Sequence, residues 1–173
     1  MKIRKSTFDD LKRMAEIYRI AREFMANHGN PNQWGRNNWP PVDLLQNDIN
    51  SGNSYVCLND FDKVIGTFFF TYGKDIEPTY RKIFDGVWKD NSPYGVVHRL
   101  AGDGSEKGIG SFCINWAYEQ VKHIRIDTHS DNVVMQNTLK KLNFAHCGTI
   151  YVSDNSPRLA FEKSAVITNI SKN

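Results

Sequence analysis

The chain has 173 residues, of which 40% are apolar and 12% aromatic, enough for one sizeable hydrophobic core. It carries 22 lysines and arginines against 19 aspartates and glutamates, which gives a net charge of +3. This charge is too small, and the basic residues are too scattered along the sequence, to predict a nucleic-acid-binding face. The even mixture of charges also excludes wholesale disorder, whereas a small polyanionic ligand stays compatible with the sequence.

The sequence shows neither a membrane span nor an export signal. Its longest apolar run, Val64 to Phe70, is far too short to cross a bilayer, so we expect no membrane partner. The N-terminus turns polar at Ser6 and lacks the apolar stretch of a signal peptide. The three cysteines are widely spaced and form no CxxC pair, which predicts neither a disulfide framework nor a metal site and favours a cytoplasmic protein.

The first half of the chain predicts an antiparallel β-region with two helices. Apolar residues fall at helical spacing after Thr7, which is placed to cap the helix together with Asp10. A polar loop carrying two tryptophans separates this helix from the next. The expected elements are a strand at Ile3–Lys5, a helix from Thr7 to about Met25, a helix from about Val42 to Ile49, and strands at Ser54–Leu58 and Lys63–Tyr72.

The second half predicts alternating strands and helices after an irregular segment at 75–93. Regular alternation and helix caps define the boundaries. The expected elements are strands at Tyr94–Ala101 and His123–Thr128, helices from about Gly108 to Val121 and from Asp131 to about Leu142, and a closing hairpin of Phe144–Val152 with Pro157–Lys163. This order is typical of a mixed α/β fold.

The glycine-rich turn at Gly102–Gly110 is the segment with the clearest chemistry. A strand that runs into glycines which then open a helix presents backbone N–H groups at a positive helix end, a site for phosphate or pyrophosphate. Lys107 adds a positive charge. Lys107 precedes Gly108 instead of following it, so this is no Walker A loop, and Cys113 interrupts a dinucleotide-binding fingerprint. The alternative is a turn that only connects two elements.

Several motifs of the second half carry a family resemblance. They are Lys107-Gly108-Ile109-Gly110, Ile124-Arg125-Ile126-Asp127-Thr128-His129, Asp131-Asn132, Lys141-Leu142-Asn143-Phe144 and Cys147-Gly148. Over about residues 95–152, their order and spacing resemble the cofactor-binding half of the GNAT superfamily of acyl-CoA N-acyltransferases. The resemblance implies an α/β (α+β) fold with a mixed central sheet of six or seven strands, antiparallel in its N-terminal part and flanked by about four helices. It also implies one domain over residues 1–164, followed by a polar tail at 165–173.

The resemblance further implies acetyl-CoA as co-substrate. Backbone N–H groups of the loop would hold the CoA pyrophosphate, and the end of the preceding strand would pair with the pantetheine arm. The implied cofactor-binding residues are Leu100, Ala101, Lys107, Gly108, Ile109, Gly110, Ser111 and Asn132. Two departures from the family pattern stand out: Ser105 occupies the usual Arg or Gln position, and Leu139 occupies the position of a Tyr that protonates the leaving thiolate.

Acetyl transfer to an amine needs a base, because deprotonating a lysine-like amine at neutral pH costs roughly 4.6 kcal/mol. We expect His98, on the strand that leads to the loop, to be this base, with His129 as the second candidate. A purely structural histidine beside Arg99 is the alternative. Tyr151 is the candidate proton donor, and its alternative role is that of a half-buried strand aromatic.

Aromatic residues in two loops predict the acceptor side. Trp34, Tyr80 and Trp88 form a candidate acceptor pocket with cation–π recognition of the amine, or else they fill the gap between loops and sheet. The first reading predicts a small-molecule amine as acceptor. A non-catalytic acyl-CoA-binding module and a nucleotide-binding module remain the alternative functions. Family members are often dimers, so the resemblance also implies a possible homodimer.

Overall fold

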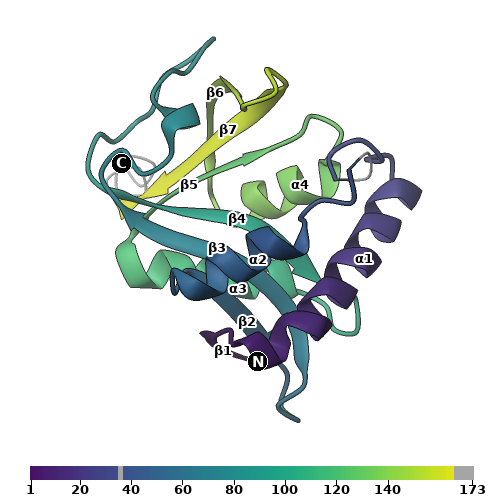
Figure 1. The fold of residues 1–173 in the computed structure, drawn as a ribbon. Coiled ribbons are helices and arrows are strands. Elements are labelled where there is room, and N and C mark those ends of the chain that lie inside the picture. The colour runs from purple at the N-terminus through teal and green to yellow at the C-terminus, as the bar shows by residue number, and fades with distance from the viewer. Residues whose placement is uncertain (35–36, 166–173) are drawn as a thin grey trace. The chain divides into compact units, whose positions relative to one another are not determined.

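The computed structural model of the chain describes residues 1–34 and 37–165 (Figure 1). Its internal contacts divide the chain into two compact units. Unit 1 combines Met1–Phe70 with His98–Trp116, and unit 2 combines Thr71–Val97 with Ala117–Asn173. Most of the polar tail expected at 165–173 lies outside the described residues, and the expectation of a single domain over residues 1–164 stays a prediction.

Seven strands hydrogen-bond in the order β1-β2-β3-β4-β5-β7-β6. They are β1 (Lys2–Lys5), β2 (Ser54–Leu58), β3 (Val64–Gly73), β4 (Tyr94–Gly102), β5 (His123–Thr128), β6 (Ala145–Tyr151) and β7 (Pro157–Ser164). The pairs β1–β2, β2–β3, β5–β7 and β6–β7 are antiparallel, whereas β4 and β5 are parallel. The mixed sheet with an antiparallel N-terminal part is therefore confirmed.

The described residues contain four α-helices, as expected from the periodicity. They are α1 (Leu11–Asn27), α2 (Val42–Asn50), α3 (Ile109–Val121) and α4 (Val133–Lys141), together with short 3-10 turns at Phe8–Asp10 and Pro78–Tyr80. None of the described helices is long and apolar enough to cross a membrane.

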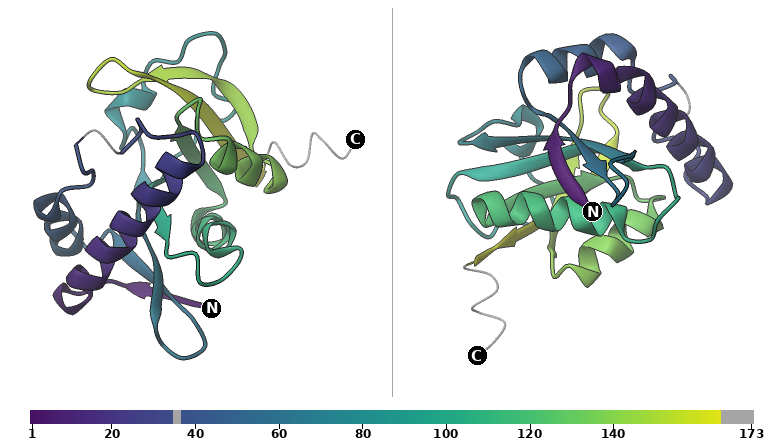
Figure 2. Two further views of the ribbon diagram at one scale, coloured as in Figure 1. Left: turned by 90° about the vertical axis from the view of Figure 1, so that its right-hand side faces the viewer. Right: turned by 90° about the horizontal axis from the view of Figure 1, so that it is seen from below.

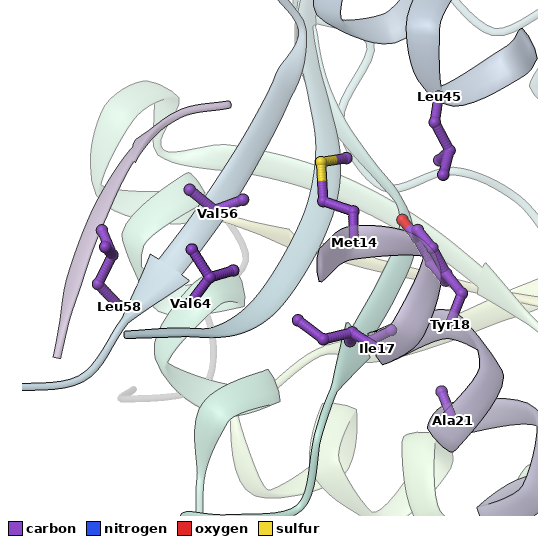
Figure 3. Close-up of a cluster of buried hydrophobic side chains, with 9 residues drawn as sticks. Met14, Ile17, Tyr18, Ala21, Leu45, Val56, Leu58 and Val64 are labelled. Carbon is purple, nitrogen blue, oxygen red and sulfur yellow. The ribbon is translucent and has the colours of Figure 1, made fainter. Parts of the chain in front are cut away.

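The core of unit 1 lies between α1, α2 and one face of β2 and β3 (Figure 3). Met14, Ile17 and Tyr18 are spaced so that one side of α1 is apolar, and they pack with Val56 and Val64 of the strands. Tyr55 alternates with Val56 and points to the other face. In β3, the register shift opposite Cys57 and Leu58 turns the residues after Val64 so that Phe68 lies beside Tyr55. Tyr55, Phe68 and Phe70 contact Trp116 of α3 on that second face. The two faces of β3 are thus both covered.

A saturated ion pair precedes α1 in unit 1. Arg4 donates from Nη1 to Asp10 Oδ2 at 2.7 Å and from Nη2 to Oδ1 at 2.8 Å, a fork that uses both carboxylate oxygens. Asp10 Oδ2 also accepts the backbone N–H of Thr7 at 2.8 Å. This last bond is the carboxylate half of the predicted helix cap, and it holds the pKa of Asp10 below its usual range together with the Arg4 bonds.

In unit 2 the segment before β4 packs against the β6–β7 hairpin, which is drawn in yellow tones (Figure 2). Phe84 exchanges backbone hydrogen bonds with Thr149 of β6, 2.8 Å each way. Two residues further on, Gly86 lies against the backbone of Cys147 and Gly148. The sequence showed only an irregular stretch here, because one isolated bridge leaves no periodic pattern.

Gly86 provides a stability test of this contact. A Cβ atom at Gly86 would overlap the carbonyl oxygen of Cys147. We therefore expect Gly86→Ala to lower the free energy of unfolding by about 3 kcal/mol, measured by urea titration. The control Gly110→Ala adds the same methyl group, whose nearest neighbour is Leu100 Cδ2 at 3.7 Å. Equal stability of the two variants would contradict the packing described for Gly86.

A buried charge network fixes the same segment to β5 and β7. Glu162 is fully buried and accepts hydrogen bonds from His123 Nε2 at 2.9 Å, Arg125 Nε at 2.8 Å and the backbone N–H of Lys89 at 2.5 Å. The Arg125 guanidinium lies over the ring of Trp88 at 4.2 Å. One carboxylate thus joins β7 to β5 and to the loop before β4.

Candidate functional site

The glycine-rich turn forms an exposed helix start within unit 1. The first hydrogen bond of α3 runs from the N–H of Phe112 to the carbonyl of Gly108 at 2.9 Å. The N–H groups of Ile109, Gly110 and Ser111 therefore precede the helical ladder and are available to a ligand. Gly108 has φ +84°, and nothing lies within 4 Å of where its Cβ would be. This open, positive helix end suits a pyrophosphate.

Asp103 holds the start of this turn in place. Its N–H donates to Ile65 O at 2.9 Å, and its carboxylate accepts from Arg13 at 2.5 Å and from the N–H of Ser105 at 2.9 Å. Arg13 also donates from Nε to Val64 O at 2.9 Å. An acidic residue next to a phosphate site would repel the ligand, and Arg13 offsets that charge. No local pattern in the sequence pointed to Arg13, because its partner is 90 residues away along the chain.

The remaining loop residues divide into buried and exposed groups. Ala101 and Ile109 have buried side chains, so only their backbone groups could meet a ligand. Lys107 is exposed and Ser111 is half-buried. In unit 2, Asn132 caps α4, because its Oδ1 accepts the N–H of Met135 at 3.1 Å. The cofactor roles of all these residues stay predictions.

The backbone of β4 departs from a regular strand just before the loop, and we interpret the departure as a β-bulge. Arg99 has φ +53°, outside the extended range of a strand. The two consecutive side chains His98 and Arg99 both reach Phe69, with the ring centroids of His98 and Phe69 6.1 Å apart and the Arg99 guanidinium 4.6 Å from the Phe69 centroid. In a regular strand they would point to opposite faces. Tyr18 fixes the bulge by donating its hydroxyl to Arg99 O at 2.8 Å.

An ion pair completes what we call the bulge cluster, made of Asp48, Phe69, His98 and Arg99. Arg99 donates from Nε at 3.0 Å and from Nη2 at 2.7 Å, both to Asp48 Oδ2. Burial raises the pKa of Asp48, although the nearby Arg99 and His98 act to lower it. Burial likewise raises the pKa of Tyr18, so its hydroxyl stays a donor. Of these four residues, the sequence predicts a role only for His98. The positive φ of Arg99 could not be predicted, because no sequence pattern marks an arginine in that conformation.

The predicted aromatic residues have different environments. Tyr80 is 1% exposed and donates its hydroxyl to Asp127 at 2.7 Å, which makes it part of the core of unit 2. Trp88 donates its ring N–H to Tyr80 O at 2.8 Å and is partly buried. Tyr151 is 45% exposed and meets Phe84 edge-on. In unit 1, Trp34 packs edge-on against Tyr18. An acceptor pocket made of these rings stays a prediction, and the burial of Tyr80 weighs against its part in it.

No family model matches the sequence, and neither does any curated protein. Solved structures do match. An acetyltransferase of the GNAT family from Streptococcus agalactiae shares 27% identity at a TM-score of 0.85, over 94% of each chain. The chain has the GNAT acetyltransferase fold.

Two other GNAT-like structures agree on the fold at lower identity. The ribosomal-protein-alanine N-acetyltransferase from Brucella melitensis is 16% identical at a TM-score of 0.60, over 95% of this chain and 99% of that one. Arabidopsis thaliana NAA60, in complex with a bisubstrate analogue, is 13% identical at 0.63, over 93% and 95%. The Streptococcus agalactiae structure, at 27% identity, supports an acyltransferase enzyme, as the sequence resemblance predicted.

The structure shows the surroundings of the two residues that depart from the GNAT sequence pattern, Leu139 and Ser105. Leu139, at the family's Tyr position, is fully buried in α4 and is an apolar core residue. Ser105 donates from Oγ to Asp103 Oδ1 at 2.6 Å and so serves the loop's own geometry. Within the described residues, no group of three or more His, Cys, Asp or Glu side chains is arranged to hold a metal ion.

Proposed function

We propose that the protein transfers an acetyl group from acetyl-CoA to the amine of a small molecule. The observation that carries the proposal is the open helix start at Gly108, which directly follows the bulged end of β4 in unit 1. An anion site at this place suits the pyrophosphate of CoA. The rest of β4 up to Ala101 would then offer backbone groups to the pantetheine arm.

The residues that would hold acetyl-CoA fit its chemistry. The N–H groups of Ile109, Gly110 and Ser111 would bind the pyrophosphate, with Lys107 adding charge. Leu100 and Ala101 would pair with the pantetheine amides. Asn132 belongs to unit 2, and its contact with CoA stays a prediction from the sequence resemblance. Arg13 keeps the neighbouring Asp103 neutralised while the anion is bound.

The transfer itself needs one proton acceptor and one proton donor. His98 takes a proton from the acceptor's ammonium group, and the resulting amine attacks the thioester carbonyl. The N–C bond forms, the C–S bond breaks, and the thiolate takes the second proton from nitrogen. Tyr151, the proton donor expected from the sequence, belongs to unit 2, and its role stays a prediction. Products are the N-acetyl compound, CoA thiol and one released proton. Because Leu139 has no hydroxyl, the family's usual donor position takes no part.

His98→Gln should separate catalysis from cofactor binding. We expect kcat to fall by at least about 100-fold, because the amine loses its base, while the KM for acetyl-CoA stays within about threefold. Steady-state release of CoA thiol measures both. The control His129→Gln removes the second candidate base. A loss confined to His129→Gln would transfer the role of base to His129, and normal rates in both variants would contradict a histidine base.

A second candidate function is an acyl-CoA-binding module without turnover. The buried Leu139 in place of the usual tyrosine favours it. Thiol release measured against a panel of small amines distinguishes the two functions. Release that depends on both acetyl-CoA and an amine supports the transferase, whereas tight binding without release supports the module.

A further inference from the structure

The ion pair between Asp48 and Arg99 in the bulge cluster uses only one oxygen of the carboxylate. Arg99 directs both of its bonds to the single oxygen Oδ2 of Asp48. Asp48 Oδ1 and Arg99 Nη1 take no part in the bonds of this pair, and neither is among the described side-chain atoms that are buried without a partner. The pair therefore presents one open anionic acceptor and one open cationic donor next to each other.

A second ion pair of unit 1 uses both oxygens of its carboxylate. Arg4 and Asp10 form a fork in which both carboxylate oxygens accept. Arg99 and Asp48 have side chains only 13% and 10% exposed, against 43% for Arg4 and 9% for Asp10, yet they lack the second bond. Charges removed from water are costly unless their remaining hydrogen-bonding sites are satisfied. A ligand that supplies both a negative and a positive group would satisfy them.

The position of this pair connects it to the acetyl-transfer site. Arg99 is the bulge residue itself, and it shares the Phe69 ring with the candidate base His98. Tyr18 donates a hydrogen bond to the backbone carbonyl of Arg99, and its ring packs edge-on against Trp34. A molecule bound between Asp48 and Arg99 would thus have its amine on the side of β4 where His98 lies, with aromatic surface near by.

We propose that the acceptor is an amino acid or a related compound with a carboxylate close to the reacting amine. The carboxylate binds Arg99 Nη1, and the ammonium group binds Asp48 Oδ1 before it loses a proton to His98. Planar guanidinium groups suit carboxylates in this way. The proposal rests on the acetyl transfer proposed above and narrows its substrate class.

The test compares matched acceptors. Each amino acid of a panel is assayed beside its carboxamide and its decarboxylated amine, with acetyl-CoA and thiol detection. We expect kcat/KM for the amino acid to exceed that of either analogue by at least about 100-fold, because a site that pairs a substrate group rejects analogues lacking it. In Arg99→Asn, whose asparagine tolerates the positive φ, this ratio should fall to within about threefold of one.

Asp10→Asn is the matched control, because it breaks the saturated ion pair of the same unit and should leave the ratio as in wild type. Binding of the amino acid in the presence of CoA, followed by calorimetry, gives a readout that needs no turnover. It should be lost in Asp48→Asn and in Arg99→Asn, and kept in Asp10→Asn. Amides or simple amines that react as well as amino acids would overturn the inference and leave acetyl transfer intact. Failure of acetyl-CoA itself to bind would instead refute the proposed function and the inference with it.

Discussion

Gly108→Trp should abolish acetyl-CoA binding without unfolding the protein. The indole would fill the open space at the start of α3 and cover the N–H groups of Ile109, Gly110 and Ser111. Loss of even two charge-assisted hydrogen bonds costs about 3 kcal/mol, so calorimetric titration should show Kd raised by at least about 100-fold. The effect is large because the pyrophosphate carries the strongest charges of the co-substrate.

Gly29→Trp is the control for this variant. Gly29 follows α1 with φ +81°, and like Gly108 it has nothing within 4 Å of a Cβ position. The two substitutions therefore impose the same kind of backbone strain and add the same ring. We expect Gly29→Trp to bind acetyl-CoA like wild type. If both variants bound equally well, the helix start would not be the pyrophosphate site.

Glu162→Gln should produce the largest loss of stability among isosteric substitutions in unit 2. It removes the negative charge that pairs with Arg125 and His123, and it leaves the Arg125 guanidinium buried beside a neutral amide. Breaking a buried pair by removing one partner costs about 3 kcal/mol. For a chain of this size, calorimetric Tm should fall by about 6–12 °C.

The control Glu16→Gln breaks an exposed ion pair with Arg13, and its Tm should be indistinguishable from wild type. A Tm of Glu162→Gln equal to that of the control would show that the network contributes nothing to stability. Replacing both Glu162 and Arg125 is a further check, because removal of the orphaned charge should recover part of the loss.

The same network predicts a pH dependence of stability. Burial by itself would raise the pKa of Glu162, but hydrogen bonds from His123, Arg125 and Lys89 outweigh it and hold that pKa below its usual range. The ionised carboxylate therefore stabilises the native state above the ordinary glutamate pKa, and the contribution is lost as pH falls through the lowered native value. Urea titrations should show a steeper acid decline for wild type than for Glu162→Gln.

The elements that sequence could predict are those with local signals. The apolar spacing of α1, the alternation of β5 and the glycines before α3 all depend on neighbours in the chain, and each predicted element is present within a few residues. The helix start at Gly108, where we propose the anion site, was predictable for the same reason, because strand, glycines and helix are contiguous. The family resemblance added the fold, which the GNAT structure from Streptococcus agalactiae supports.

The features that sequence could not predict depend on contacts between distant residues. Arg13 reaches Asp103 across 90 positions, and Asp48 reaches Arg99 across 51. The bulge at Arg99 requires a positive φ that arginine rarely adopts, and Tyr18 and Asp48 hold it there. Tyr80 was predicted at the acceptor side from its place in a loop, whereas its ring lies in the core of unit 2. Loop position alone does not determine burial.

The proposed reaction moves an acetyl group from CoA to an amine on this protein. The most direct measurement is a single-turnover reaction with acetyl-CoA labelled in its acetyl carbons, followed by mass spectrometry of CoA and of the acceptor. We predict that the label appears on the acceptor's nitrogen in a one-to-one ratio with CoA thiol, and only when an amine is present. Binding of acetyl-CoA without transfer of the label to any amine would contradict the account.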